Sequence, residues 1–279
     1  RERGNVLGQK TKLVSEAGVV VPLLGNEKST EMLVEIGAAI NKRDKLLTVN
    51  LTEVPNQTFL DAVMEENTRS TCLKRRINIL AETRKLHIDF ESVVTHDLAE
   101  TVTELSDQAH CDWLVVAWKG KAYSGILINN PIGWLMTHLN SDFALFKDNG
   151  VRYISKVLLA LRPGRKDKNF IAVADRICTF YDASLTMLHI IPEDMPESEE
   201  VEIFQNASYL LRNIKGKNKI KIHKSNKPTS ALSNISAEYD LLIIGTPEKD
   251  SWLNVLFGAG KDKFTESSAC SVLRLTMKD

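Results

Sequence analysis

The hydrophobic positions of the chain fall into short apolar runs separated by amphipathic stretches. Two runs are similar: residues 111–120 and 239–248 each contain an aspartate, then four to six aliphatic or aromatic residues, then a turn. This pattern is typical of a buried strand in a parallel sheet. Ligands of open α/β sheets bind beyond the carboxyl ends of such strands. We therefore expect the function to lie in the segments that follow Ala117 and Gly245.

Strands and helices are predicted to alternate along the rest of the chain. Apolar residues three or four apart mark the helices, as in the stripe of Leu98, Val102 and Leu105. Pro22 cannot donate a backbone hydrogen bond, which predicts an irregular or edge-like first strand. The predicted strands lie near residues 19–24, 46–51, 88–94, 113–117, 143–146, 157–161, 185–191, 219–223, 241–245 and 270–275.

The alternation occurs twice in the same order. The distance from Val21 to Thr48 is 27 residues, and so is the distance from Leu159 to Thr186. Alternating strands and helices favour parallel sheets with right-handed crossovers. We therefore predict an α/β fold of two consecutive five-stranded doubly wound parallel-sheet units, each with helices on both faces. The expected divisions are a lead-in or linker over 1–16, a first repeat over 17–149 and a second over 150–279.

Composition restricts the possible partners. Lys plus Arg total 36 and Asp plus Glu total 36, so the formal net charge is zero. A general nucleic-acid binder would carry a strongly basic surface, and none is indicated. The four cysteines are far apart and form no C-x-x-C pair, which predicts reduced and mostly buried thiols in a cytosolic protein. No apolar run approaches the roughly 20 residues that span a bilayer.

The sequence contains none of the common catalytic or metal-binding motifs. There is no G-x-S-x-G, H-E-x-x-H, P-loop or G-x-G-x-x-G pattern. His96 and His110 have acidic or cysteine neighbours but no second ligand at metal-binding spacing, so we interpret them as capping, surface or core residues. His189 lies inside an apolar strand and is predicted to be a satisfied core residue. We therefore predict no enzyme, catalytic residue, metal or cofactor.

The tandem order of elements resembles the universal stress protein fold from about residue 17 onward. In nucleotide-binding members the fourth strand ends in G-x-x-G-x9-G-[ST], where glycines let the backbone close on phosphates. An aspartate after the first strand helps to hold the nucleotide. The matching positions here are degenerate: Ala117, Gly120, Asn130 and Pro131 in the first repeat, Gly245, Glu248, Gly258 and Ala259 in the second, and Leu24 and Arg162 in place of the aspartates.

These departures predict that both repeats have lost nucleotide binding. Pro131 has neither a hydroxyl nor an N–H group, and Ala259 lacks the hydroxyl. Glu248 would place a carboxylate beside a phosphate, and two like charges about 4 Å apart repel by roughly 4 kcal/mol at an effective dielectric near 20. The spacing of the motif is kept in both repeats, which supports the fold.

The residues Trp118-Lys119-Gly120-Lys121 after the fourth strand, together with the apolar segment 18–25, resemble the cytoplasmic C-terminal domain of cation-chloride cotransporters. Those carriers belong to the amino acid–polyamine–organocation superfamily. The resemblance implies a non-enzymatic, homodimeric regulatory domain at the cytoplasmic face of the plasma membrane, with no membrane insertion of its own. Because the chain begins with Arg1, we expect its transmembrane transport domain upstream of that residue.

Several alternatives stay open at this stage. The strands at 143–146 and 272–275 could pair within one chain or across a dimer. Trp118, Trp134 and Trp252 could fill empty nucleotide crevices or anchor a protein contact. The rival functions are a stand-alone tandem universal stress protein that binds ATP and, ranked last, an enzyme of the same nucleotide-binding class.

Overall fold

The computed structural model describes residues 15–25, 27–55, 68–118, 139–161, 167–245 and 268–278. The first half supplies β1 (Val19–Leu23), α1 (Thr30–Ile40), β2 (Lys45–Glu53), α3 (Thr68–Arg84), β3 (His87–Thr95), α4 (Leu98–Gln108), β4 (Trp113–Ala117) and β5 (Asp142–Lys147). The second half supplies β6 (Lys156–Ala160), α6 (Asp167–Tyr181), β7 (Ser184–Ile191), α7 (Glu197–Leu211), β8 (Asn218–Lys224), α8 (Pro228–Ser236), β9 (Leu241–Gly245) and β10 (Ser271–Thr276).

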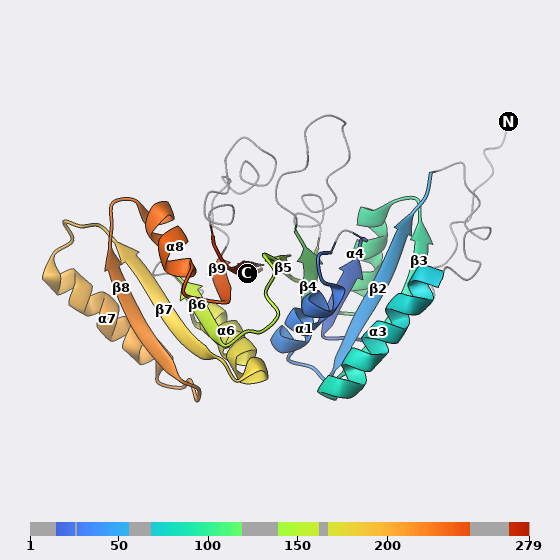
Figure 1. Cartoon of the computed structure of the whole chain (residues 1–279), viewed down its shortest axis with the longest axis horizontal. Helices are drawn as coiled ribbons and strands as arrows, with labels where there is room; N and C mark the ends of the chain where they lie inside the picture. The colour runs from blue at the N-terminus through green and yellow to red at the C-terminus, as the bar shows by residue number, and fades with distance from the viewer. Residues whose placement is uncertain are drawn as a thin grey trace.

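These strands form one mostly parallel ten-stranded sheet in the order β3-β2-β1-β4-β5-β10-β9-β6-β7-β8. Figure 1 shows β1 to β4 on the right and β6 to β8 on the left, with β5 and β9 between them. This arrangement confirms the predicted α/β fold with two doubly wound units. The division of the chain at residues 16 and 149 stays a prediction.

The two units are joined by an antiparallel pair at the centre of the sheet. Strand β10 pairs with β5 from Val272 opposite Lys147 to Thr276 opposite Phe143. On their other sides β5 pairs with β4 and β10 pairs with β9, both in parallel. The pairing that could have formed across a dimer therefore forms within the chain.

The predicted edge-like character of β1 is wrong, because β1 lies between β2 and β4. Its register with β2 runs along all five residues, and Pro22 lies opposite Val49. Its register with β4 covers only Val19 and Val20. Pro22 thus lies beyond the last residue of β1 that pairs with β4. Its missing N–H group costs no hydrogen bond on that side, although β1 is an interior strand of the sheet.

Local sequence signals explain where the first helix begins and how it packs. Ser29 has extended backbone angles, and its hydroxyl accepts a hydrogen bond from the Met32 N–H group at 3.3 Å, as an N-cap does. A Cβ atom at Gly37 would lie 2.7 Å from Val21 Cγ2. The glycine therefore lets α1 approach β1 closely.

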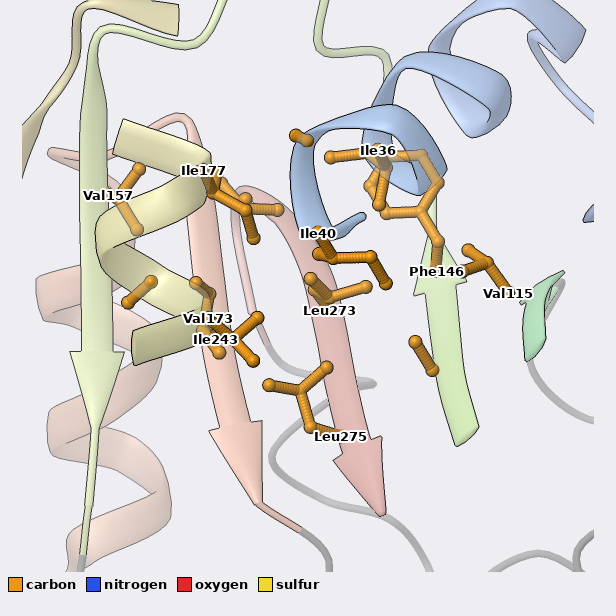
Figure 2. Close-up of a cluster of buried hydrophobic side chains, with 14 of the residues drawn as sticks. Ile36, Ile40, Val115, Phe146, Val157, Val173, Ile177, Ile243, Leu273 and Leu275 are labelled. Carbon is orange, nitrogen blue, oxygen red and sulfur yellow. The ribbon is translucent and has the colours of Figure 1, made fainter. Parts of the chain in front are cut away.

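The largest hydrophobic core is shared by the two halves. It contains side chains of α1, α3, α6 and α7 and of strands from both units, whereas smaller clusters beneath α4 and α8 each belong to one half. Figure 2 shows the central part of the shared core, where α1, α6 and β10 contribute Ile36, Ile40, Val173, Ile177, Leu273 and Leu275.

A polar cluster also joins α1, α3 and α6. Glu35 is only 8% exposed, and its Oε1 lies 3.0 Å from Arg84 Nε. The Tyr181 hydroxyl donates to Glu35 Oε2 at 3.2 Å, and Arg176 Nε donates to the Ile40 carbonyl at 3.0 Å. Burial, followed by the Glu35 charge, raises the pKa of Tyr181 well above its ordinary value. The halves are thus connected by polar as well as apolar contacts.

Candidate functional site

The carboxyl ends of the strands are where this fold would hold a ligand. Of the ten motif positions, Leu24, Ala117 and Gly245 lie within the described residues. Leu24 follows β1 and Ala117 ends β4, and these two strands are neighbours; Gly245 ends β9, beside β6. The predictions for Gly120, Asn130, Pro131, Arg162, Glu248, Gly258, Ala259, Trp134 and Trp252 lie outside the described residues.

The first half has a cavity of about 360 Å³ at this edge. Residues from the start of α1, from the ends of β4 and β5, and from the turn after β5 line it. They include Leu33 and Phe146, which are apolar, and Trp118, which is half-buried. We define this space as the first crevice. Trp118 lines this cavity without filling it, so both roles considered for the tryptophan, filling the crevice and anchoring a protein contact, stay predictions.

The carboxylate of Glu27 accepts hydrogen bonds from two backbone N–H groups beside the first crevice. Its Oε1 accepts from the Leu24 N–H group at 2.6 Å, and its Oε2 accepts from the Gly25 N–H group at 3.1 Å. Gly25 has a φ of +78°, a conformation that favours glycine. Successive N–H groups before a helix form a ready anion site. Here the anion is a side chain of the protein itself.

A second carboxylate lines the same crevice. The Asp148 side chain is 7% exposed, its Oδ1 accepts from the Gly150 N–H group at 2.7 Å, and its Oδ2 lies 3.7 Å from Arg152 Nη1. Lys28 also lines the crevice, and its ammonium group lies close to Gly150. A Cβ atom at Gly150 would be 3.2 Å from Lys28 Nζ. The lining thus carries two carboxylates and two lysines, Lys28 and Lys147, and offers a triphosphate no net positive charge.

In the second half an aromatic ring covers the end of β9. A Cβ atom at Gly245 would lie 2.7 Å from Phe170 Cζ and 3.2 Å from both Cε atoms. Phe170 lies in the first turn of α6 and packs against the shared core. We call the end of β9 at Gly245, which the Phe170 ring covers, the second crevice. Sequence reasoning placed Phe170 on the apolar face of its helix but missed its position over Gly245.

His189 only partly matches its prediction as a satisfied core residue. The side chain is buried, at 3% exposure, and Nδ1 lies 3.1 Å from the Leu161 carbonyl, which identifies Nδ1 as the protonated nitrogen. Among the described residues, however, Nε2 has no hydrogen-bond partner. Burial lowers the pKa of His189, and this outweighs the Leu161 hydrogen bond and the Asp167 charge. The imidazole is therefore held neutral.

Acidification is expected to destabilise the protein through His189. Because the pKa falls below the ordinary 6.5 on folding, the unfolded state binds more protons in the interval between the two values. The stability contributed by the neutral ring is complete above 6.5 and is lost as the pH falls toward the folded-state pKa. Urea unfolding at about pH 7.5 and about pH 5.5 should show a larger loss for the wild type than for His189→Gln. Equal losses would contradict the assignment.

Glu27→Ala is expected to lower the free energy of unfolding by about 1–2 kcal/mol, because two backbone donors lose a charged acceptor. Urea unfolding measures the loss, and faster hydrogen exchange at Leu24 and Gly25 locates it. Glu193→Ala is the matched control: Glu193 is exposed, and the hydrogen bond recorded for it is made by its backbone N–H group. The same loss in both variants would show that Glu27 does not hold the loop.

The remaining candidates have ordinary surroundings. His96 is half-buried and its Nδ1 contacts the Val54 carbonyl at 3.0 Å, whereas the side chain that caps α4 is that of Asp97. All four cysteines are free: Cys178 and Cys270 are buried, Cys111 is intermediate and Cys72 is exposed. Burial raises the pKa of Cys178 to about 12, so its thiol stays protonated at neutral pH.

Two further kinds of feature are absent from the described ranges. No group of three His, Cys, Asp or Glu side chains in them could hold a metal ion. The helices in those same ranges are too short or too polar for any of them to cross a membrane.

Solved structures share this fold across nearly the whole chain. A universal stress protein from Archaeoglobus fulgidus DSM 4304 aligns with a TM-score of 0.65 at 13% identity, covering 96% of this chain and 99% of its own. The cytoplasmic domain of a prokaryotic cation chloride cotransporter aligns with a TM-score of 0.56 at 11% identity, covering 93% and 95%. No protein-family model and no curated protein sequence matches the chain. The chain therefore has a universal-stress-protein-like fold.

Proposed function

We propose that the chain is a non-enzymatic cytosolic regulatory domain of a secondary membrane transporter of the cation-chloride cotransporter type, and that it works without a bound nucleotide. One observation carries the proposal: the chain's own groups bind the backbone donors beside the first crevice and cover the end of β9 in the second. The Glu27 carboxylate is bound to the Leu24 and Gly25 N–H groups, and the Phe170 ring lies against Gly245. A module with this fold, whose anion-binding groups already have partners within the chain, is suited to contacts with other protein surfaces.

Regulation would then depend on differential contacts between two arrangements of subunits. The proposed partners are a transmembrane transport domain upstream of Arg1 and a second copy of the chain. Because β5 and β10 already pair with each other inside the sheet, a homodimer would have to use another surface. Sedimentation of the purified domain tests the dimer.

The transport role is tested with the longer protein that contains the segment before Arg1. It is reconstituted in liposomes with and without residues 15–279, and chloride and potassium fluxes are measured. We expect cation-dependent chloride flux in both, with a rate changed several-fold by the deletion. Identical rates would contradict a regulatory role, and the lack of membrane-spanning segments upstream would contradict the transporter assignment.

The alternative function is a stand-alone tandem universal stress protein that binds ATP. It is favoured by the cavity of about 360 Å³ at the ends of β4 and β5, which offers space at the edge where this fold takes ligands. Against it stand the two carboxylates, Glu27 and Asp148, in the lining of that cavity. Titration with ATP separates the two functions.

A further inference from the structure

A second pocket lies at the opposite edge of the sheet, in the second half. It has a volume of about 280 Å³ and is lined at the amino ends of β6, β7 and β8, beside the end of α8. These three strands are parallel, so their amino ends are remote from the carboxyl-end crevices. We call this space the amino-end pocket.

The amino-end pocket has a buried floor and a basic rim. Leu185, Thr186 and Tyr239 in its lining are 1%, 2% and 9% exposed. Lys156, Lys217 and Lys219, also in the lining, are exposed. The pocket therefore combines a largely buried tyrosine and threonine with three exposed lysines in its lining.

The positive charge of the rim is not neutralised within the described residues. None of the three rim lysines forms an ion pair there. Glu238 is the one carboxylate in the lining, and it lies 3.9 Å from the ammonium of a fourth lysine, Lys221. Nearby Asp240 already accepts from the Ser155 and Lys156 N–H groups and the Ser155 hydroxyl, at 2.9–3.0 Å. The four lysines at this edge of the sheet therefore outnumber the two carboxylates, and the net charge around the pocket is positive.

Protection of an edge strand explains only part of this charge. Strand β8 is at the edge of the sheet, and lysines on such strands discourage pairing with other chains. Lys219 and Lys221 belong to β8 and fit that role. Lys156 begins β6, which is flanked by β7 and β9, and Lys217 precedes β8. Their place around a concave floor requires another explanation.

We propose that the amino-end pocket binds an organic phosphate, with its organic body against Tyr239 and Thr186 and its phosphate among the rim lysines. A phosphate monoester carries nearly two negative charges at neutral pH and three acceptor oxygens, which suit three ammonium donors. The ligand is either a free organic phosphate or a phosphomonoester lipid headgroup. The proposal does not depend on the transporter assignment.

The probes are phenyl phosphate, inorganic phosphate and vesicles of phosphatidylcholine with or without phosphatidic acid. Amide NMR of the wild type is expected to show saturable shifts at Ser184, Thr186 and Lys219 with phenyl phosphate, and about tenfold weaker binding of inorganic phosphate. Sedimentation with phosphatidic-acid vesicles, but not with phosphatidylcholine alone, would identify a lipid headgroup as the source. Phenyl phosphate binding without vesicle binding would identify a free phosphate.

The variant K156Q/K217Q/K219Q is expected to weaken binding by about tenfold or more. The matched control K42Q/K74Q/K168Q removes three other exposed lysines with no ion pair among the described residues, and it should bind as the wild type does. Amide spectra check that both variants are folded. No saturable binding of phenyl phosphate or phosphatidic-acid vesicles up to about 10 mM phosphate, or equal weakening in both variants, would overturn the proposal.

Discussion

Leu273→Ala is expected to lower the free energy of unfolding by about 3–5 kcal/mol and to weaken both halves of the protein together. Leu273 is fully buried in β10 and belongs to the core that α1 and α6 share. Shortening a leucine in such a place removes its transfer free energy and leaves a cavity. Because β10 pairs directly with β5, the defect lies in the element that joins the two units.

Urea unfolding measures the total loss, and native-state hydrogen exchange in β2 and β7 shows how it is distributed. Leu105→Ala is the matched control, because Leu105 is 1% exposed in the cluster beneath α4, which belongs to the first half alone. We expect Leu273→Ala to reduce protection in both strands and Leu105→Ala to act mainly on β2. Loss confined to β7 in the Leu273 variant would mean that the halves fold independently.

Gly245→Ala is expected to cost about 1–3 kcal/mol, because its Cβ would lie 2.7 Å from Phe170 Cζ. The backbone adds no strain, since Gly245 is not among the described glycines with positive φ. The cost should fall to about 0.5 kcal/mol or less in the Phe170→Ala background, where the opposing ring is gone. This coupling would show that the ring closes the second crevice.

A double-mutant cycle by urea unfolding measures the coupling between Gly245 and Phe170. Gly216→Ala supplies the control for a glycine substitution, because a Cβ there would meet no atom within 4 Å. We expect that control to change the free energy of unfolding by about 0.5 kcal/mol or less. Additive effects of the Gly245 and Phe170 changes would contradict a closed second crevice.

The sequence predicts the fold well because the pattern of buried residues is local and regular. Aliphatic runs such as 241–244 are fully buried, and the stripe on α4 buries Val102 and Leu105 as its spacing predicts. The repeated 27-residue spacing reflects two copies of one strand–helix–strand unit. Such features depend on neighbours a few residues apart.

What the sequence could not give depends on contacts between distant segments. The sequence shows that Pro22 lacks a backbone donor, which indicated an edge strand. It does not show that β1 pairs with β4 only at Val19 and Val20, before Pro22 is reached. The sequence indicated that β5 and β10 could pair, but it left open whether two strands more than a hundred positions apart would do so within one chain or across a dimer. The closure of the second crevice depends on the position of one ring over one glycine, which a helical stripe cannot specify. For the hydrogen bonds of Glu27, the available sequence signal was its position, two residues before the Ser29 cap.

The direct test of the proposal that neither crevice binds a nucleotide is calorimetric titration of the wild-type protein with Mg²⁺-ATP, repeated by NMR with the amide signals of Leu24, Gly25 and Gly245 as reporters. We expect no saturable heat and no shift of these signals at ATP concentrations up to about 1 mM, which corresponds to a binding free energy weaker than about −4 kcal/mol. Micromolar affinity with shifts at Leu24 and Gly25 or at Gly245 would contradict the loss of nucleotide binding and favour an ATP-binding stress protein.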